Sequence, residues 1–248
     1  MIDIKFDFTT DSGNYWENFW DKNDGMGYGN TDPDSVSSTL QEYHRLLWSR
    51  ELPDGQTMNL KAGSGSYYLT WDNYRFGSDS IIVGLRYKRY QHIIKQVMER
   101  VVDYKAYYED LIRRSYTIGG MIIFPKHINS INQERGKSKI ISDRWDLTLE
   151  CIRRYYLGQD NPLMSVLNSD KPFFDLFVNF KGYVDFFFLQ DCVSKDYSEV
   201  EIWEGNGDFS EEGLPKTVDD YFRFIDKEFA FLEKRNIRID AFCKEMGL

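Results

Sequence analysis

The sequence has few cysteines and no segment suited to a membrane. Its 3 cysteines are far apart, so their spacing predicts neither a zinc site nor a disulfide framework. The first residues, MIDIKFDFTTDSGN, turn polar early, and we expect no signal peptide. The most apolar segment, residues 173–190, is interrupted by charged side chains such as Asp175, which lipid would not tolerate. These absences favour a cytoplasmic protein that makes no membrane contact.

Positive charge is also scarce. The chain has 31 Lys and Arg against 40 Asp and Glu, a net charge of −9, which excludes a surface that binds nucleic acid all over. Residues 113–154 differ, because they hold 9 Lys and Arg against 4 Asp and Glu, a local charge of +5. The sequence therefore predicts a basic region in an otherwise acidic protein.

The sequence lacks a Gly-rich phosphate-binding loop, since no Gly-Lys-Ser/Thr follows Gly63-Ser64-Gly65. These glycines instead suit the turn of a hairpin over Met58–Trp71. Further strands are predicted at Ile2–Phe8, Thr117–Phe124 and Val200–Trp203. No linker or repeat divides the chain, and we expect one domain over residues 1–248. The predicted class is α+β, predominantly helical with a small antiparallel sheet.

Apolar spacing predicts the helices. One pattern starts with a cap at Ser78 or Asp79 and continues to about residue 114, with a break near Asp103. A second helix begins at an N-cap, Ser142, and ends before Gly158. Residues 173–191 read as two helical pieces hinged at residues 181–182, and Thr217 starts the last helix.

Polar residues concentrate in one stretch, residues 119–156, where a loop joins a buried strand to a helix. Amide and guanidinium donors near a helix N-terminus form an anion site, and loops of this kind carry ligands. The candidates for proton transfer are His127 and Glu150. The candidates for ligand binding are Lys126, Asn129, Asn132, Arg135, Arg144, Arg153 and Arg154.

Two of these assignments have a structural alternative. Arg144 falls on the apolar side of its helix, so its guanidinium either joins the preceding loop to the core or contacts an anionic ligand. Glu150 with Arg153 and Arg154 has the i, i+3 and i, i+4 spacing of ordinary helix salt bridges. His127 likewise serves either as an acid–base group or as a hydrogen-bonded loop residue.

We expect no cofactor. Asp143, Asp146 and Glu150 would present three carboxylates at i, i+3 and i+7, which could hold Mg²⁺. Arg153 and Arg154 compete for the same carboxylates, so the magnesium interpretation is the weaker one.

Two functions remain open from the residues. The first is binding of a phosphate-bearing ligand, a nucleotide or a nucleic-acid end, with hydrolysis or transfer at phosphorus. The second is a non-enzymatic acidic protein, such as an inhibitor, immunity factor or phage-defence component, that engages a basic protein partner. A weaker alternative rests on Arg86 and His92, whose spacing is similar to that of the HEPN ribonucleases. The sequence leaves open whether the chain is an enzyme and whether it forms homo-oligomers.

Three strings, IGGMIIFPKHINSINQERG, ISDRWDLTLECIRRYY and FKGYVDFFFLQD, resemble a family of uncharacterised bacterial proteins of unassigned function. The resemblance covers about half of the chain. It implies a bacterial or phage-linked cytoplasmic protein and assigns no reaction and no catalytic residue.

Overall fold

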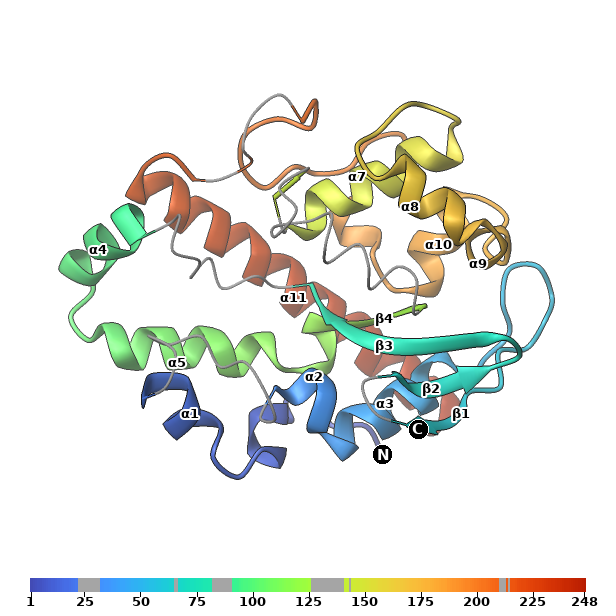
Figure 1. Cartoon of the computed structure of the whole chain (residues 1–248), viewed down its shortest axis with the longest axis horizontal. Helices are drawn as coiled ribbons and strands as arrows, with labels where there is room; N and C mark the ends of the chain where they lie inside the picture. Colours follow the sequence, from blue (N-terminus) through green and yellow to red (C-terminus); the bar gives the residue numbers. More distant parts are fainter. Residues whose placement is uncertain are drawn as a thin grey trace.

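The computed structural model describes residues 1–21, 32–64, 67–81, 91–125, 141–142, 144–209, 213 and 215–248. Helices predominate and surround one small sheet, which confirms the α+β class (Figure 1). No helix in these ranges is long and apolar enough to cross a membrane.

The sheet has the order β1-β2-β3-β4, and each neighbouring pair is antiparallel. Its strands are β1 (Lys61–Ser64), β2 (Tyr67–Trp71), β3 (Tyr74–Ser80) and β4 (Met121–Pro125). The hairpin of β1 and β2 and the buried strand β4 were both predicted. β3 was not, because the sequence pattern starts a helix at Ser78 or Asp79. In the register of the sheet Ser78 instead pairs with Ile123.

Short N-terminal elements lie on one side of the sheet: η1 (Phe8–Asp11), α1 (Tyr15–Asp21), α2 (Pro33–Val36) and α3 (Ser38–Trp48). The expected strand at residues 2–8 is wrong. Ile2 and Phe8 are buried in the core, but the backbone there pairs with no strand among the described residues. The alternating pattern therefore reflects side-chain docking.

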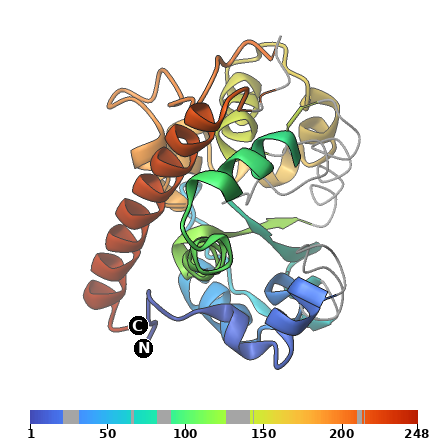
Figure 2. The ribbon, with the colours of Figure 1, turned by 90° about the vertical axis from the view of Figure 1, so that its left-hand side faces the viewer.

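Two helices follow the sheet's third strand, α4 (Gln91–Arg100) and α5 (Tyr104–Ser115). The predicted break near Asp103 is confirmed, because Asp103 caps α5 through the backbone N–H of Ala106. The last helix, α11 (Val218–Met246), starts at Thr217 with a capping box, as predicted, and runs past α4, α5 and the sheet (Figure 2).

On the other side of the sheet are α7 (Trp145–Tyr156), α8 (Met164–Ser169), α9 (Lys171–Asp175) and α10 (Phe180–Phe186). The predicted helix N-cap at Ser142 is wrong, since Arg144 occupies that position. The hinge expected at residues 181–182 lies earlier, at residues 176–179, and Gly182 is inside α10. Residues 200–203 form no strand beyond an isolated bridge between Val193 and Val200.

Arg235 of α11 binds the backbone of the 118–121 segment, which contains two glycines and approaches α5 and α11 closely. Its buried guanidinium donates to the carbonyl oxygens of Phe187 at 3.1 Å and Met121 at 2.9 Å, and also to that of Gly119. A Cβ on Gly120 would lie 1.9 Å from the backbone oxygen of Ser115. The chain can approach this closely only without side chains at both glycines.

Candidate functional site

The residues predicted from the sequence divide into two groups. Arg144, Glu150, Arg153 and Arg154 belong to α7 or its N-cap. The others lie outside the described residues, in the segment that follows Pro125: Lys126, His127, Asn129, Asn132 and Arg135. Asp143, one of the three candidate magnesium ligands, is also outside them.

Arg144 is buried, with 1% of its surface exposed, and its nitrogens bind protein acceptors. Nε donates to Asp146 at 3.0 Å and Nη2 donates to the same carboxylate. Nη1 donates to the carbonyl oxygens of Glu204 and Gly213, both at 2.8 Å. Asp146 also accepts the backbone N–H of Trp203 at 2.8 Å. This geometry favours the structural alternative, in which Arg144 joins α7 to the 203–213 segment.

Glu150 is held in a similar way. Its carboxylate accepts Nε of Arg153 and Nε of Arg154, both at 2.7 Å, and Nη2 of Arg153 at 2.9 Å. Arg154 also donates to the carbonyl oxygen of Gly207 at 2.7 Å. Both carboxylate oxygens therefore accept charged hydrogen bonds, which leaves little freedom for proton transfer. Within the described ranges, no group of three or more His, Cys, Asp or Glu could hold a metal ion.

A different polar group lies between α2, α3 and β3. Trp48 Nε1 donates to His44 Nδ1 at 2.9 Å, which leaves the imidazole proton on Nε2. His44 Nε2 lies 3.1 Å from Ser78 Oγ, and Ser78 Oγ lies 3.5 Å from Asp34 Oδ1. Each group donates a hydrogen bond to the next, so the Trp48–His44–Ser78–Asp34 network ends at the carboxyl group of Asp34.

Burial sets the charges in this network. His44 is fully buried, and the loss of water lowers its pKa from 6.5 to about 3, with a smaller contribution from the positive charge of Arg235. His44 is therefore neutral at physiological pH. Loss of water also raises the pKa of Asp34 well above its usual value, and the nearby carboxylates of Asp32 and Asp79 raise it further. Asp34 is half-buried, so it keeps contact with the surface.

Two tyrosines complete the surroundings of Asp34. Tyr116 Oη donates to Asp32 Oδ1 at 3.3 Å, and burial is again the main cause that raises the pKa of Asp32. Tyr68 is 4% exposed, and its hydroxyl has no hydrogen-bond partner of normal geometry among the described residues. Burial and the negative charge of Asp34 both raise the pKa of Tyr68. A carboxyl group with a raised pKa beside a buried phenol and a buried histidine is an arrangement suited to proton transfer.

Sequence analysis missed this network for a physical reason. Asp34 lies in a polar loop region, His44 on an amphipathic helix, and Ser78 looked like a helix cap. Only the packing of α2 and α3 against β3 brings them together. One local signal was present. His44 and Trp48 lie four residues apart on one helix face, where a buried imidazole needs partners.

The comparisons with known proteins give a family and no activity. No curated protein and no solved structure matches the chain. A family model described as a family of unknown function, DUF6994, matches residues 2–239. Because this match covers nearly the whole sequence, the chain belongs to the DUF6994 family.

Proposed function

We propose that the protein is an enzyme in which Asp34 acts as a general acid on a phosphate-bearing substrate. The observation that carries the proposal is the state of Asp34, a half-buried carboxyl group whose pKa is raised and which is reached by the hydroxyl of Ser78. A carboxyl group with a raised pKa keeps its proton to higher pH and can give it to a leaving group.

The network supplies what the acid needs after it has lost its proton. The carboxylate of Asp34 would accept the Ser78 hydroxyl, whose oxygen in turn accepts Nε2–H of His44. His44 stays neutral, because its pKa is about 3, and so acts as a fixed donor. Such preorganised donors stabilise a charge that appears during the reaction.

The basic region supports the choice of substrate. Pro125, the residue before Lys126, pairs with Phe76 in β3, two residues from Ser78. The segment predicted to bind phosphate therefore leaves the sheet close to the network. In hydrolysis, water would attack phosphorus, the bond to the leaving oxygen would break, and the proton of Asp34 would move to that oxygen.

A series of phosphate monoesters tests the role of the acid. An alkyl leaving group needs a proton, whereas 4-nitrophenolate does not, so Asp34→Asn should reduce hydrolysis of alkyl esters by about 10²–10⁴-fold and affect 4-nitrophenyl phosphate far less. Asp160→Asn, at an exposed aspartate whose side chain has no hydrogen bond to another described residue, is the matched control. Arg135→Ala should weaken the binding of both substrates alike.

Two results would contradict the proposal. Absence of turnover by the wild-type protein across phosphate monoesters and diesters would rule out chemistry at phosphorus. If Asp34→Asn reduced the rate of hydrolysis equally for both kinds of leaving group, Asp34 would not be the general acid, even if the protein is an enzyme.

A further inference from the structure

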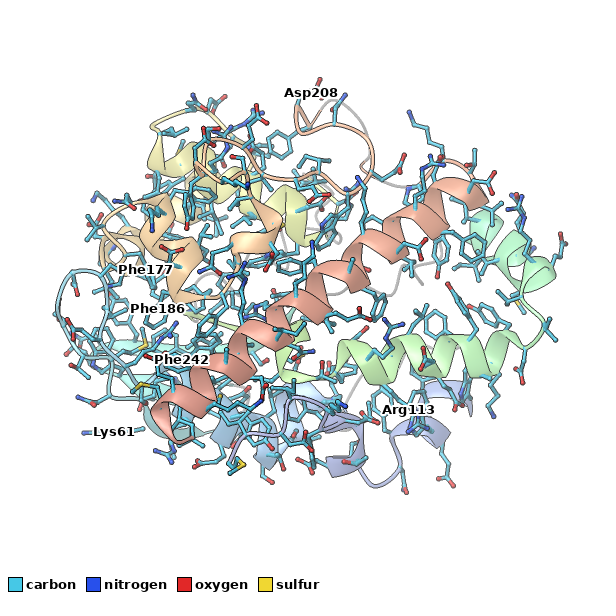
Figure 3. All side chains as sticks on the ribbon, turned by 180° about the vertical axis from the view of Figure 1, so that it is seen from behind. Lys61, Arg113, Phe177, Phe186, Asp208 and Phe242 are labelled. Carbon is cyan, nitrogen blue, oxygen red and sulfur yellow. The ribbon has the colours of Figure 1, made fainter. Side chains whose placement is uncertain are left out.

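A second feature lies away from this network, at the C-terminal end of α11. A pocket of about 700 Å³ opens between residues 50–53, the 177–186 segment and α11. Phe177, Phe186 and Phe242 lie together at this end of the molecule (Figure 3). The volume is in the range of small-molecule sites.

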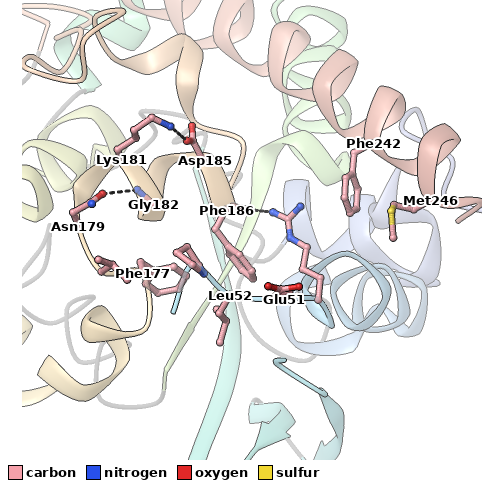
Figure 4. Close-up of a pocket in the computed structure, with 13 residues that line it drawn as sticks. Glu51, Leu52, Phe177, Asn179, Lys181, Gly182, Asp185, Phe186, Phe242 and Met246 are labelled. Carbon is pink, nitrogen blue, oxygen red and sulfur yellow. Dashed lines mark hydrogen bonds and ion pairs between the residues drawn. The ribbon is translucent and has the colours of Figure 1, made fainter. Parts of the chain in front are cut away.

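Arg50 lines the pocket and lies close to the rings of Phe186 and Phe242, which Figure 4 shows in the pocket lining. Its guanidinium carbon lies 4.4 Å from the ring centres of Phe186 and Phe188 and 4.7 Å from that of Phe242. Nη2 donates to the carbonyl oxygen of Phe186. Burial among these rings lowers the pKa of Arg50 to about 10, so the group keeps its charge at neutral pH.

The donors of Arg50 are not all used. Nε is buried without a hydrogen-bond acceptor, and Nη1 donates to no atom of the described residues. No carboxylate in these ranges lies within ion-pair distance of the guanidinium. A partly buried charge without a counter-charge is costly, and an anion in the pocket would offset that cost.

The other charged groups of the lining do not fill this role. Asp185 already accepts Lys181, Tyr197 at 2.7 Å and Gln190 at 3.0 Å. Glu51 lies at the exposed rim, where water solvates its carboxylate. Arg50 is thus the charged group of the lining that is both half-buried and unmatched.

Apart from Asn179 and Lys181, the rest of the lining is mostly apolar. Its apolar side chains include Leu52, Pro53, Phe177, Val178, Phe242 and Met246. Val178 and Met246 are 61% and 58% exposed, so apolar surface continues to the mouth of the pocket. Val178 also has a φ of 67°, a strained value for a β-branched residue. Strain of this kind persists where the surrounding structure imposes it, often at ligand sites.

From these contacts we infer that the pocket binds a monocarboxylate with an unbranched apolar tail, whose carboxylate pairs with Arg50 and whose tail lies against the phenylalanines. One planar guanidinium matches the charge of a single carboxylate. A phosphate dianion would require further cationic donors, and the other cation of the lining, Lys181, already pairs with Asp185. The inference is independent of the function proposed for Asp34.

Calorimetric titration of the full-length protein with decanoate, decanol and decyl phosphate tests the inference. Decanoate should bind one to one, and decanol should bind about tenfold more weakly because it cannot pair with a guanidinium. Arg50→Gln should remove the preference for decanoate over decanol.

A second variant keeps the test valid if Arg50→Gln does not fold. Met246→Glu places a negative charge at the exposed rim and should weaken decanoate about tenfold while leaving decanol nearly unchanged. Ile237→Glu is the matched control, since Ile237 is on the same helix, is 65% exposed and does not line the pocket.

Three results would overturn the inference. They are the absence of saturable decanoate binding, equal affinities for decanoate and decanol, and equal weakening by Met246→Glu and Ile237→Glu. Tighter binding of decyl phosphate than of decanoate would overturn the choice of a carboxylate.

Discussion

Replacement of Arg144 by methionine measures how much the buried Arg144–Asp146 pair stabilises the protein. The variant keeps a side chain of similar length but removes the two bonds to Asp146 and those to the carbonyls of Glu204 and Gly213. Asp146, which is 0% exposed, would keep only the backbone N–H of Trp203 as a hydrogen-bond donor among the described residues. Breaking a buried pair in this way costs about 3–5 kcal/mol of the free energy of unfolding.

The assay is equilibrium unfolding in urea, supported by thermal melting, where the loss should lower the Tm by about 10 °C. Arg45→Met is a matched control, because Arg45 also binds one carboxylate with two nitrogens, at 2.7 and 2.5 Å from Glu42. That pair is 40% and 50% exposed, so its loss should cost less than about 1 kcal/mol.

The double variant Arg144→Met with Asp146→Leu distinguishes two costs: the loss of the ion pair itself and the burial of the unpaired carboxylate of Asp146. It should recover part of the stability, because it no longer leaves a buried carboxylate unpaired. Equal losses in Arg144→Met and Arg45→Met would refute the structural assignment of Arg144. An unchanged stability together with lost ligand affinity would restore its role as a ligand-binding residue.

The remaining predictions concern the network and the core. Asp34→Asn should raise the free energy of unfolding at pH 7, because the raised pKa of Asp34 means that its ionisation opposes folding. Urea unfolding at several pH values should show that this gain disappears as the pH falls towards 3.8. Burial lowers the pKa of His44 from 6.5 to about 3, so the unfolded state binds the proton first as the pH falls. The protein should therefore lose up to about 4 kcal/mol of its free energy of unfolding between these two pH values. The His44→Gln variant should lack this pH dependence in the same measurement. Gly120→Ala should fail to give a cooperative thermal transition, because its Cβ would meet the oxygen of Ser115, whereas Gly13→Ala, which meets nothing within 4 Å, should fold normally.

Local patterns predicted the elements that depend on nearby residues. Residues 145–156 and 218–246 have continuous apolar stripes with clear ends, and β4 ends at a proline. β3 was missed because the apolar residues after Ser78 match a helix, and a strand is recognised there only through β4, about 40 residues later. The expected strand at residues 2–8 failed for the opposite reason, since alternation alone does not supply a partner strand.

The candidate sites show the same limit. The sequence identified Arg144 as a polar residue on an apolar helix face, and burial confirms that observation; its acceptors at residues 204 and 213 are distant in the chain. The raised pKa of Asp34 depends first on burial and then on the charges of Asp32 and of Asp79, which lies in β3. Phosphate binding by residues 126–135 and an acidic surface for a basic partner both stay predictions.

The contacts of Arg235 also affect when the protein can finish folding during translation. The carbonyl oxygens that it binds, at Gly119, Met121 and Phe187, belong to segments synthesised long before α11. Until α11 has left the ribosome, these oxygens and the apolar surface around β4 lack the helix that covers them. A nascent chain of this protein should therefore depend on chaperones, or aggregate, up to the moment when its last described helix emerges.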